Sequence, residues 1–293
     1  MDVPYLTEQL VNGLATGSIY AVIAVGYAMV YSILYLINFA HGDVIMVGAF
    51  AALTLIGMAF PVPAAILAAC AVGALVALAV ERIAYRPVRY ANRVVPMISA
   101  LGAGLVLATL AHLVWGPEVQ PFPQLIPRGN IEIAGIAVPQ QALIILGLSL
   151  AIVMFASFLL ERTRLGRATK CVCQDIYAAQ LMGIPVNLII PLVYAVGGFL
   201  GVAGGILFAM YFNAVFIQMG LLATTKAWAA AMLGGVGNFY GAALGGLILG
   251  VAEMLAVVTV GSAYKDGVAL VIIVAVLLLR PQGLFGRRVV ERS

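Results

Sequence analysis

Charged residues are scarce in this sequence. Asp, Glu, Lys and Arg make up 9% of its 293 residues, whereas hydrophobic residues make up 64%. A water-soluble chain of this length needs a polar shell around its core, and so few charged residues do not provide one. The composition therefore excludes a soluble globular protein and predicts a single transmembrane domain over residues 1–293.

Residues that usually carry chemistry are also few. The three cysteines, Cys70, Cys171 and Cys173, do not make a disulfide framework, and the lone C-x-C has no further ligand nearby for zinc. The sequence has two histidines, and no H-E-x-x-H, G-x-S-x-G or G-x-x-x-x-G-K-[ST] pattern occurs in it. We therefore expect no enzyme activity and no catalytic, cofactor-binding or metal-binding residue. If ATP drives this protein, another chain must bind it.

Long apolar runs are abundant. A transmembrane helix needs roughly 20 mainly apolar residues, and about nine runs of this kind are bounded by charge, proline or turn residues. They cover residues 10–34, 43–60, 62–83, 96–115, 139–160, 187–212, 221–236, 241–261 and 264–280. The pattern predicts an all-α, polytopic bundle of about nine spans, or of eight if residues 221–261 form a re-entrant hairpin.

Glycines recur at four-residue spacing in two of these runs. Helices in lipid associate through close packing, because lipid tails are as apolar as leucine. We therefore interpret these glycines as helix-packing surfaces: Gly197, Gly201 and Gly205, then Gly241, Gly245, Gly246 and Gly250.

Basic residues predict the orientation, because cytoplasmic loops retain Lys and Arg. Three clusters hold most of them: Arg82, Arg86, Arg89 and Arg93; Arg162, Arg164, Arg167 and Lys170; Arg280, Arg287, Arg288 and Arg292. Nine spans place all three on one side if the N-terminus is periplasmic and the C-terminus cytoplasmic. Arg128 and Lys265 fall on the other side, against the bias. We expect a multi-pass protein of the bacterial inner membrane.

Asn38, His41 and Asp43 lie between two apolar runs that leave scarcely any loop. One interpretation is an interfacial turn in which Asn38 or Asp43 caps the next helix. The other is a broken helix beside a transport path, where irregular backbone is tolerated because it lines a cavity. The residues alone favour neither.

Lys226 and Glu253 each interrupt an apolar run at a similar distance from the turn at residues 237–240. At about 1.5 Å per residue, both lie roughly 17–20 Å from that turn, near the bilayer midplane. An intramembrane charge is costly without a partner or water, so we expect a Lys226–Glu253 contact or a shared wet cavity. The pair is either a structural tie between helices or part of a translocation path.

Residues 168–182 have the pattern of an amphipathic helix outside the bilayer, which Gly183 and Pro185 end. Such a helix either rests on lipid headgroups or docks into a groove on another protein.

Several motifs carry a family resemblance. Residues 177–183 (YAAQLMG) are similar to the EAA motif of ABC importer permeases, with Tyr177 where Glu is usual. Five further segments carry the same resemblance: residues 37–43 (INFAHGD), 81–89 (ERIAYRPVR), 165–183, 231–253 (AMLGGVGNFYGAALGGLILGVAE) and 280–286 (RPQGLFG). Nearly end to end, the chain resembles the LivH-type permease of branched-chain amino acid ABC importers.

The resemblance implies an ABC importer permease fold and an import function. The chain would pair with a LivM-like permease, two cytoplasmic ATPase subunits that bind ATP and Mg, and a periplasmic amino-acid-binding protein, with no nucleic-acid partner. Leucine, isoleucine and valine would cross by alternating access. Because polar groups are costly in apolar runs, we hypothesise that the path includes Asn38, His41, Asp43, Lys226 and Glu253. The ATPase would dock on the cytoplasmic loop at residues 162–187, through Asp175, Tyr177, Ala178, Ala179 and Gly183.

Two alternatives stay open. A permease of the same type would carry urea, short amides or other amino acids. A stand-alone secondary transporter or channel would instead use Lys226 and Glu253 as an ion or proton relay.

Overall fold

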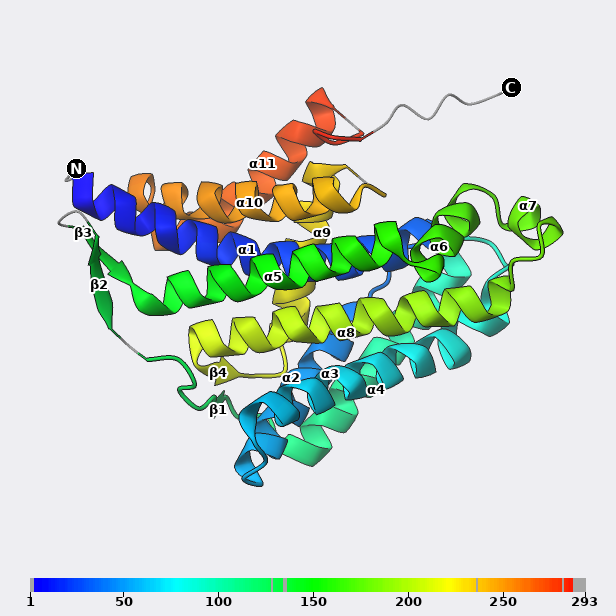
Figure 1. The fold of residues 1–293 in the computed structure, drawn as a ribbon, viewed down its shortest axis with the longest axis horizontal. Coiled ribbons are helices and arrows are strands. Elements are labelled where there is room, and N and C mark those ends of the chain that lie inside the picture. The colour runs from blue at the N-terminus through cyan, green and yellow to red at the C-terminus, as the bar shows by residue number, and fades with distance from the viewer. Residues whose placement is uncertain (1–2, 128, 134–135, 236, 281, 287–293) are drawn as a thin grey trace.

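The computed structural model describes residues 3–286 except 128, 134–135, 236 and 281, and it is mostly helical (Figure 1). Each of the nine apolar runs contains one helix. These are α1 (Val3–Leu34), α2 (His41–Gly57), α3 (Val62–Val80), α4 (Val94–Trp115), α5 (Gln140–Arg162), α8 (Val186–Phe212), α9 (Met219–Gly234), α10 (Phe239–Thr259) and α11 (Lys265–Leu279). The predicted helical bundle is confirmed.

The apolar helices fall into two length classes. Among the described residues, six helices are long and apolar enough to cross a membrane: α1, α4, α5, α8, α10, and α3 with the π-turn Glu81–Tyr85 and the 3-10 turn Arg86–Val88 that continue it. The helices α2, α9 and α11 have 17, 16 and 15 residues. At about 1.5 Å per residue they are shorter than the roughly 30 Å hydrocarbon core.

Helices α1 and α8 form the centre of the bundle. Of the apolar window of α1, 89% is buried, against 22% for α4 and α5. Glycines allow this close packing, as predicted: a Cβ at Gly246 of α10 would lie 2.6 Å from Ala21 Cα, and one at Gly197 of α8 would lie 2.9 Å from the Gly26 carbonyl oxygen, both on α1. Helix α1 therefore lies between α10 and α8 (Figure 1).

Two short antiparallel ribbons are additions to the all-α prediction. Strand β1 (Gln120–Pro121) pairs with β4 (Ala214–Val215), and β2 (Asn130–Ile133) pairs with β3 (Ile136–Pro139), with Asn130 opposite Pro139. Strands β1, β2 and β3 form in the proline-rich connection after α4, where proline disfavours helix, and β4 follows α8. They lie at the same end of the molecule as the start of α1 (Figure 1).

The opposite end carries α6 (Arg164–Gln174) and α7 (Ile176–Leu181) (Figure 1). The connection from α3 to α4 reaches the same end, because Arg89 donates to Asn187 Oδ1 beside α7 at 3.4 Å. The arginine-bearing segments after α3 and after α5 therefore share one end. Of the third cluster, Arg287, Arg288 and Arg292 lie outside the described residues, as does Arg128.

The prediction of one amphipathic helix over residues 168–182 is wrong. The chain bends at Asp175, which has φ −158° and ψ 115°, and two helices result. Asp175 Oδ1 accepts hydrogen bonds from the N–H groups of Tyr177 at 2.8 Å and Ala178 at 3.0 Å. Asp175 therefore caps a new helix instead of continuing the old one.

Candidate functional site

The site begins at the break between α1 and α2. Tyr35 has φ +51°, so the chain reverses at the end of α1 and returns into the bundle. Asn38 then stabilises the turn: its Oδ1 accepts hydrogen bonds from the Ala40 N–H at 3.2 Å and from the Tyr85 hydroxyl at 3.3 Å. The break is thus an ordered turn, and the side-chain oxygen of Asn38 bonds inside the turn rather than capping α2.

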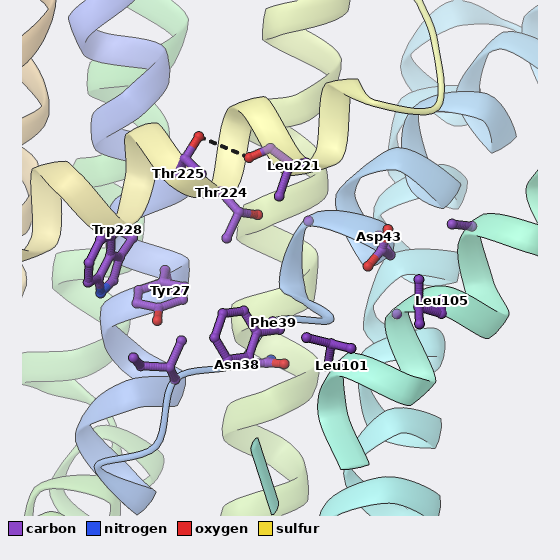
Figure 2. Close-up of a pocket in the computed structure, with 14 residues that line it drawn as sticks. Tyr27, Asn38, Phe39, Asp43, Leu101, Leu105, Leu221, Thr224, Thr225 and Trp228 are labelled. Atoms are coloured by element: carbon purple, nitrogen blue, oxygen red, sulfur yellow. Dashed lines mark hydrogen bonds between the residues drawn. The ribbon is translucent and has the colours of Figure 1, made fainter. Parts of the chain in front are cut away.

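A cavity of about 370 Å³ opens beside this turn. Its walls come from α1, the α1–α2 turn, the start of α2, α4 and α9 (Figure 2). The lining residues are Tyr27, Ile37, Asn38, Phe39, Gly42, Asp43, Leu101, Gly104, Leu105, Ala108, Leu221, Thr224, Thr225 and Trp228. A mainly apolar wall with few polar groups is typical of a small-molecule site.

The structure separates the five predicted path residues into three places. Asn38 and Asp43 line the cavity. His41 is 1% exposed and packs edge-on against Tyr27, with 5.7 Å between ring centroids, behind the cavity lining. Lys226 and Glu253 lie elsewhere, between α9 and α10.

The predicted contact between Lys226 and Glu253 is confirmed, because the two side chains form a salt bridge. The sequence reasoning missed three further members of this group. Lys226 Nζ also lies 2.6 Å from Asp266 Oδ1, Lys265 Nζ lies 3.3 Å from Glu253 Oε2, and the Tyr20 hydroxyl donates to the same oxygen at 3.1 Å. Two of them, Lys265 and Asp266, are adjacent charged residues at the start of α11, and this pattern could have indicated their role from the sequence.

A second buried ion pair was also missed. Glu81 and Arg89 form a salt bridge, and their side chains are 0% and 3% exposed. Arg89 was assigned from the sequence to a basic loop cluster, whereas it lies inside the protein. The pair closes the π-turn from which Tyr85 reaches Asn38, so a chain of side-chain contacts joins the start of α8 to the cavity.

The predicted docking residues gather at the end that carries α7. Tyr177 is 71% exposed, Ala178 is exposed, and Ala179 is buried against the protein. Gly183 ends the segment with φ +80°, a left-handed conformation that glycine adopts without strain. Helix α7 therefore presents an accessible face.

Helix α6 attaches this segment to α1. The Tyr35 hydroxyl donates to the Cys173 carbonyl at 3.2 Å, and the Cys173 thiol lies 3.5 Å from the Ser32 hydroxyl. Burial raises the pKa of the Cys173 thiol, which favours its protonated form.

Within the residues that the structure describes, no group of three or more His, Cys, Asp or Glu side chains could hold a metal ion.

The long apolar helices and the cavity between them are those of a polytopic membrane protein with a small-molecule site. The family model for the permease component of branched-chain amino acid transport systems matches residues 9–277, and the chain belongs to this family. It is 39% identical to the branched-chain amino acid permease protein BraD of Pseudomonas aeruginosa, over 99% of both chains. It is 34% identical to the permease protein LivH of Escherichia coli, over 98% of both chains.

The fold has a solved counterpart. PsaBC from Streptococcus pneumoniae, determined in complex with Fab, aligns with a TM-score of 0.50 and 14% identity. The alignment covers 92% of this chain and 91% of that chain. At this level of identity the likeness concerns the fold alone.

Proposed function

We propose that this chain is a permease subunit of an ATP-driven, binding-protein-dependent importer of leucine, isoleucine and valine. The observation that carries the proposal is the apolar cavity at the broken α1–α2 segment, in a chain that belongs to the branched-chain permease family. The cavity offers an aliphatic amino acid an apolar wall and a few polar contacts. ATP and Mg would bind two cytoplasmic ATPase subunits, and a LivM-like permease and a periplasmic amino-acid-binding protein would complete the assembly.

The proposed topology has nine passes in the bacterial inner membrane, with a periplasmic N-terminus and a cytoplasmic C-terminus. The shared end of the arginine-bearing segments after α3 and α5 supports this, since such segments stay in the cytoplasm. In this topology α2 and α9 are short passes, each completed by the irregular segment before it. Irregular backbone at membrane depth is tolerated where it lines a cavity.

The proposed mechanism is alternating access at the interface of the two permeases. ATPase closure would move α6 and α7, and the contacts from Asn187 through Arg89 and Glu81 to the π-turn would carry the movement toward Tyr85. The Tyr85 hydroxyl bonds Asn38, which lines the cavity. Movement at the docking end would thereby open the cavity toward the cytoplasm.

Reconstitution in proteoliposomes tests the proposal. The chain with its partner permease, ATPases and binding protein should take up leucine only when ATP is supplied, and the chain alone should take up none. Uptake by the chain alone, indifferent to ATP, would overturn the proposal in favour of a secondary transporter or channel. ATP-dependent uptake of urea or short amides without leucine would refute the substrate assignment.

Labelling tests the topology. Single cysteines at Tyr90 and Leu181, both strongly exposed at the arginine-bearing end, should resist an impermeant maleimide in intact spheroplasts. A cysteine at Tyr264, before α11, should react. Reaction of Tyr90 and Leu181 cysteines from opposite sides of the membrane would contradict the shared orientation.

A further inference from the structure

Two short helices begin at the same place in the bundle. Helix α2 begins at His41 and α9 at Met219, and a Cβ added to Gly42 would lie 2.6 Å from the Gly220 carbonyl carbon. Their first turns therefore touch, and Gly42 and Leu221 from these turns line the cavity. A helix N-terminus carries a partial positive charge of roughly half an elementary charge, so two of them face one small space.

The same space contains an unpaired carboxylate. Asp43 lines the cavity, and none of the salt bridges within the described part of the chain involves it. The lining residues include no lysine, arginine or histidine. A carboxylate in an apolar wall is costly unless a cation meets it, and here the cation is not supplied by the cavity wall.

Three hydrogen-bond donors also lack partners in this part of the structure. The Tyr27 hydroxyl, the Thr224 hydroxyl and the Trp228 indole N–H are buried, and no hydrogen-bond acceptor within the described residues meets them. Tyr27 is 2% exposed and lines the cavity. Buried donors of this kind are normally satisfied, so three around one cavity indicate a ligand or water.

The polar groups are ordered in space. Asp43 lies on the side of Leu101 and Leu105, Tyr27 and Trp228 lie on the opposite side, and Thr224 stands between them (Figure 2). The cavity thus holds one carboxyl group, uncharged donors and two positive helix ends beside an aliphatic wall. This combination is complementary to a small zwitterion with an apolar side chain.

Building on the proposed function, we propose that this cavity is the transmembrane binding site for the aliphatic amino acid itself. Asp43 binds the substrate ammonium. The Thr224 hydroxyl and the first turns of α2 and α9 bind the carboxylate, and Leu101 and Leu105 contact the side chain. Tyr27 and Trp228 offer further donors on the far side of Thr224.

Cysteine protection in the assembled transporter tests the site. With Cys70, Cys171 and Cys173 replaced by alanine or serine, Thr225→Cys places a thiol in the cavity wall. Its hydroxyl bonds only its own helix, to the Leu221 carbonyl at 3.0 Å and the Leu222 carbonyl at 2.9 Å, so the change leaves the proposed contacts intact. Thr259→Cys is the matched control, because Thr259 makes the same kind of bond on α10 and does not line the cavity.

We expect saturating leucine to slow labelling of the Thr225 cysteine by a small methanethiosulfonate about tenfold, and to leave the Thr259 cysteine unaffected. Isoamylamine and 4-methylpentanoate, which each lack one charged group, should protect less well. Asp43→Asn should raise the leucine concentration for half-protection by about tenfold, and Thr224→Val should do so where Thr224→Ser does not.

The outcomes separate this inference from the function on which it rests. A complex that imports leucine but shows no leucine protection of the Thr225 cysteine overturns the site and leaves the importer intact. Protection that Asp43→Asn leaves unchanged, in a variant that still copurifies with its ATPases, overturns the ammonium assignment. A complete complex that imports none of the three amino acids refutes the proposed function.

Discussion

Replacing Lys226 with methionine should destabilise the bundle without removing transport from the molecules that remain folded. The side chain of Lys226 is 12% exposed and bridges Glu253 on α10 and Asp266 on α11. Methionine retains most of the apolar stem but removes the charge. The change leaves the Glu253 carboxylate, which is 0% exposed, without its salt-bridge partner on α9.

The size of the effect follows from what Glu253 retains. Removing one member of a buried ion pair costs about 3–5 kcal/mol when the remaining charge is left alone. Here Glu253 Oε2 keeps the Lys265 ammonium at 3.3 Å and the Tyr20 hydroxyl at 3.1 Å, so one carboxylate oxygen stays satisfied. We therefore expect a loss of about 2 kcal/mol in the free energy of unfolding, below the range for an isolated buried charge.

The double variant Lys226→Met with Glu253→Gln provides the internal control. It removes the unpaired carboxylate together with its partner, and should recover to within about 1 kcal/mol of the original protein, because replacing both members of a pair costs less than breaking it. Unfolding by SDS titration in mixed micelles measures the stability. A double variant as unstable as the sum of the two single variants would refute the reasoning.

Transport measured on the same variants distinguishes the two interpretations of the pair. Because Lys226 and Glu253 do not line the cavity, leucine uptake per folded complex should stay near that of the original protein. If leucine uptake falls in Lys226→Ala and Glu253→Ala complexes that assemble and hydrolyse ATP normally, the pair is part of the translocation path.

Two further substitutions test the packing. Gly246→Ala should lower the free energy of unfolding by about 1–3 kcal/mol, because its Cβ would lie 2.6 Å from Ala21 Cα. Gly147→Ala is the control and should change it little, because nothing lies within 4 Å of the added Cβ. Equal thermal stability of the two variants in micelles would contradict the α1–α10 packing. Trp115→Phe keeps one six-membered aromatic ring near Phe50 but loses the rest of the indole and its 2.9 Å hydrogen bond to Thr54 Oγ1. Unfolding titrations should therefore show a loss of at least about 1 kcal/mol, and no loss would mean that the bond is weak.

The positions of the helices were predictable because a transmembrane helix is recognised in a sequence by the length and apolarity of its run of residues. All nine apolar runs contain a helix, and the Lys226–Glu253 contact followed from the cost of an intramembrane charge. The meeting of α2 and α9 was not predictable. It depends on Gly42 and Gly220, which lie far apart in the sequence and outside any recurring pattern of glycines.

Some polar contacts, like some helix contacts, could not be predicted from the sequence. Counting arginines in loops cannot show which of them are paired, so Arg89 was assigned to a basic cluster although it lies buried against Glu81. Thr224 and Trp228 were missed because isolated polar residues in an apolar helix resemble packing residues until the tertiary fold places them around one space. The bend at Asp175 had a local signal, since aspartate is a favoured helix N-cap, but the amphipathic pattern on both sides concealed it.

The N-cap of α7 by Asp175 leads to a prediction about binding of the ATPase. Asp175→Ala removes the acceptor for the Tyr177 and Ala178 N–H groups, and the six residues of α7 have little other helical stability. Loss of an N-cap costs about 1 kcal/mol, which would weaken ATPase binding about fivefold if α7 must be folded to dock. Asp175→Asn keeps the acceptor and should bind the ATPase normally.

Titrating purified ATPase onto the permease pair in nanodiscs measures this difference. The unfolding stability of the permease should be alike in both variants, because α7 projects at the end of the molecule and the central packing of α1 and α8 does not depend on it (Figure 1). If Asp175→Asn weakens binding as much as Asp175→Ala, the charge rather than the cap is what the ATPase recognises. If neither variant changes the affinity, and the exposed-face variants Tyr177→Ala and Ala178→Leu also leave it unchanged, then α7 is not the docking surface. The contacts from Asn187 to Tyr85 would then not carry movement from the ATPase.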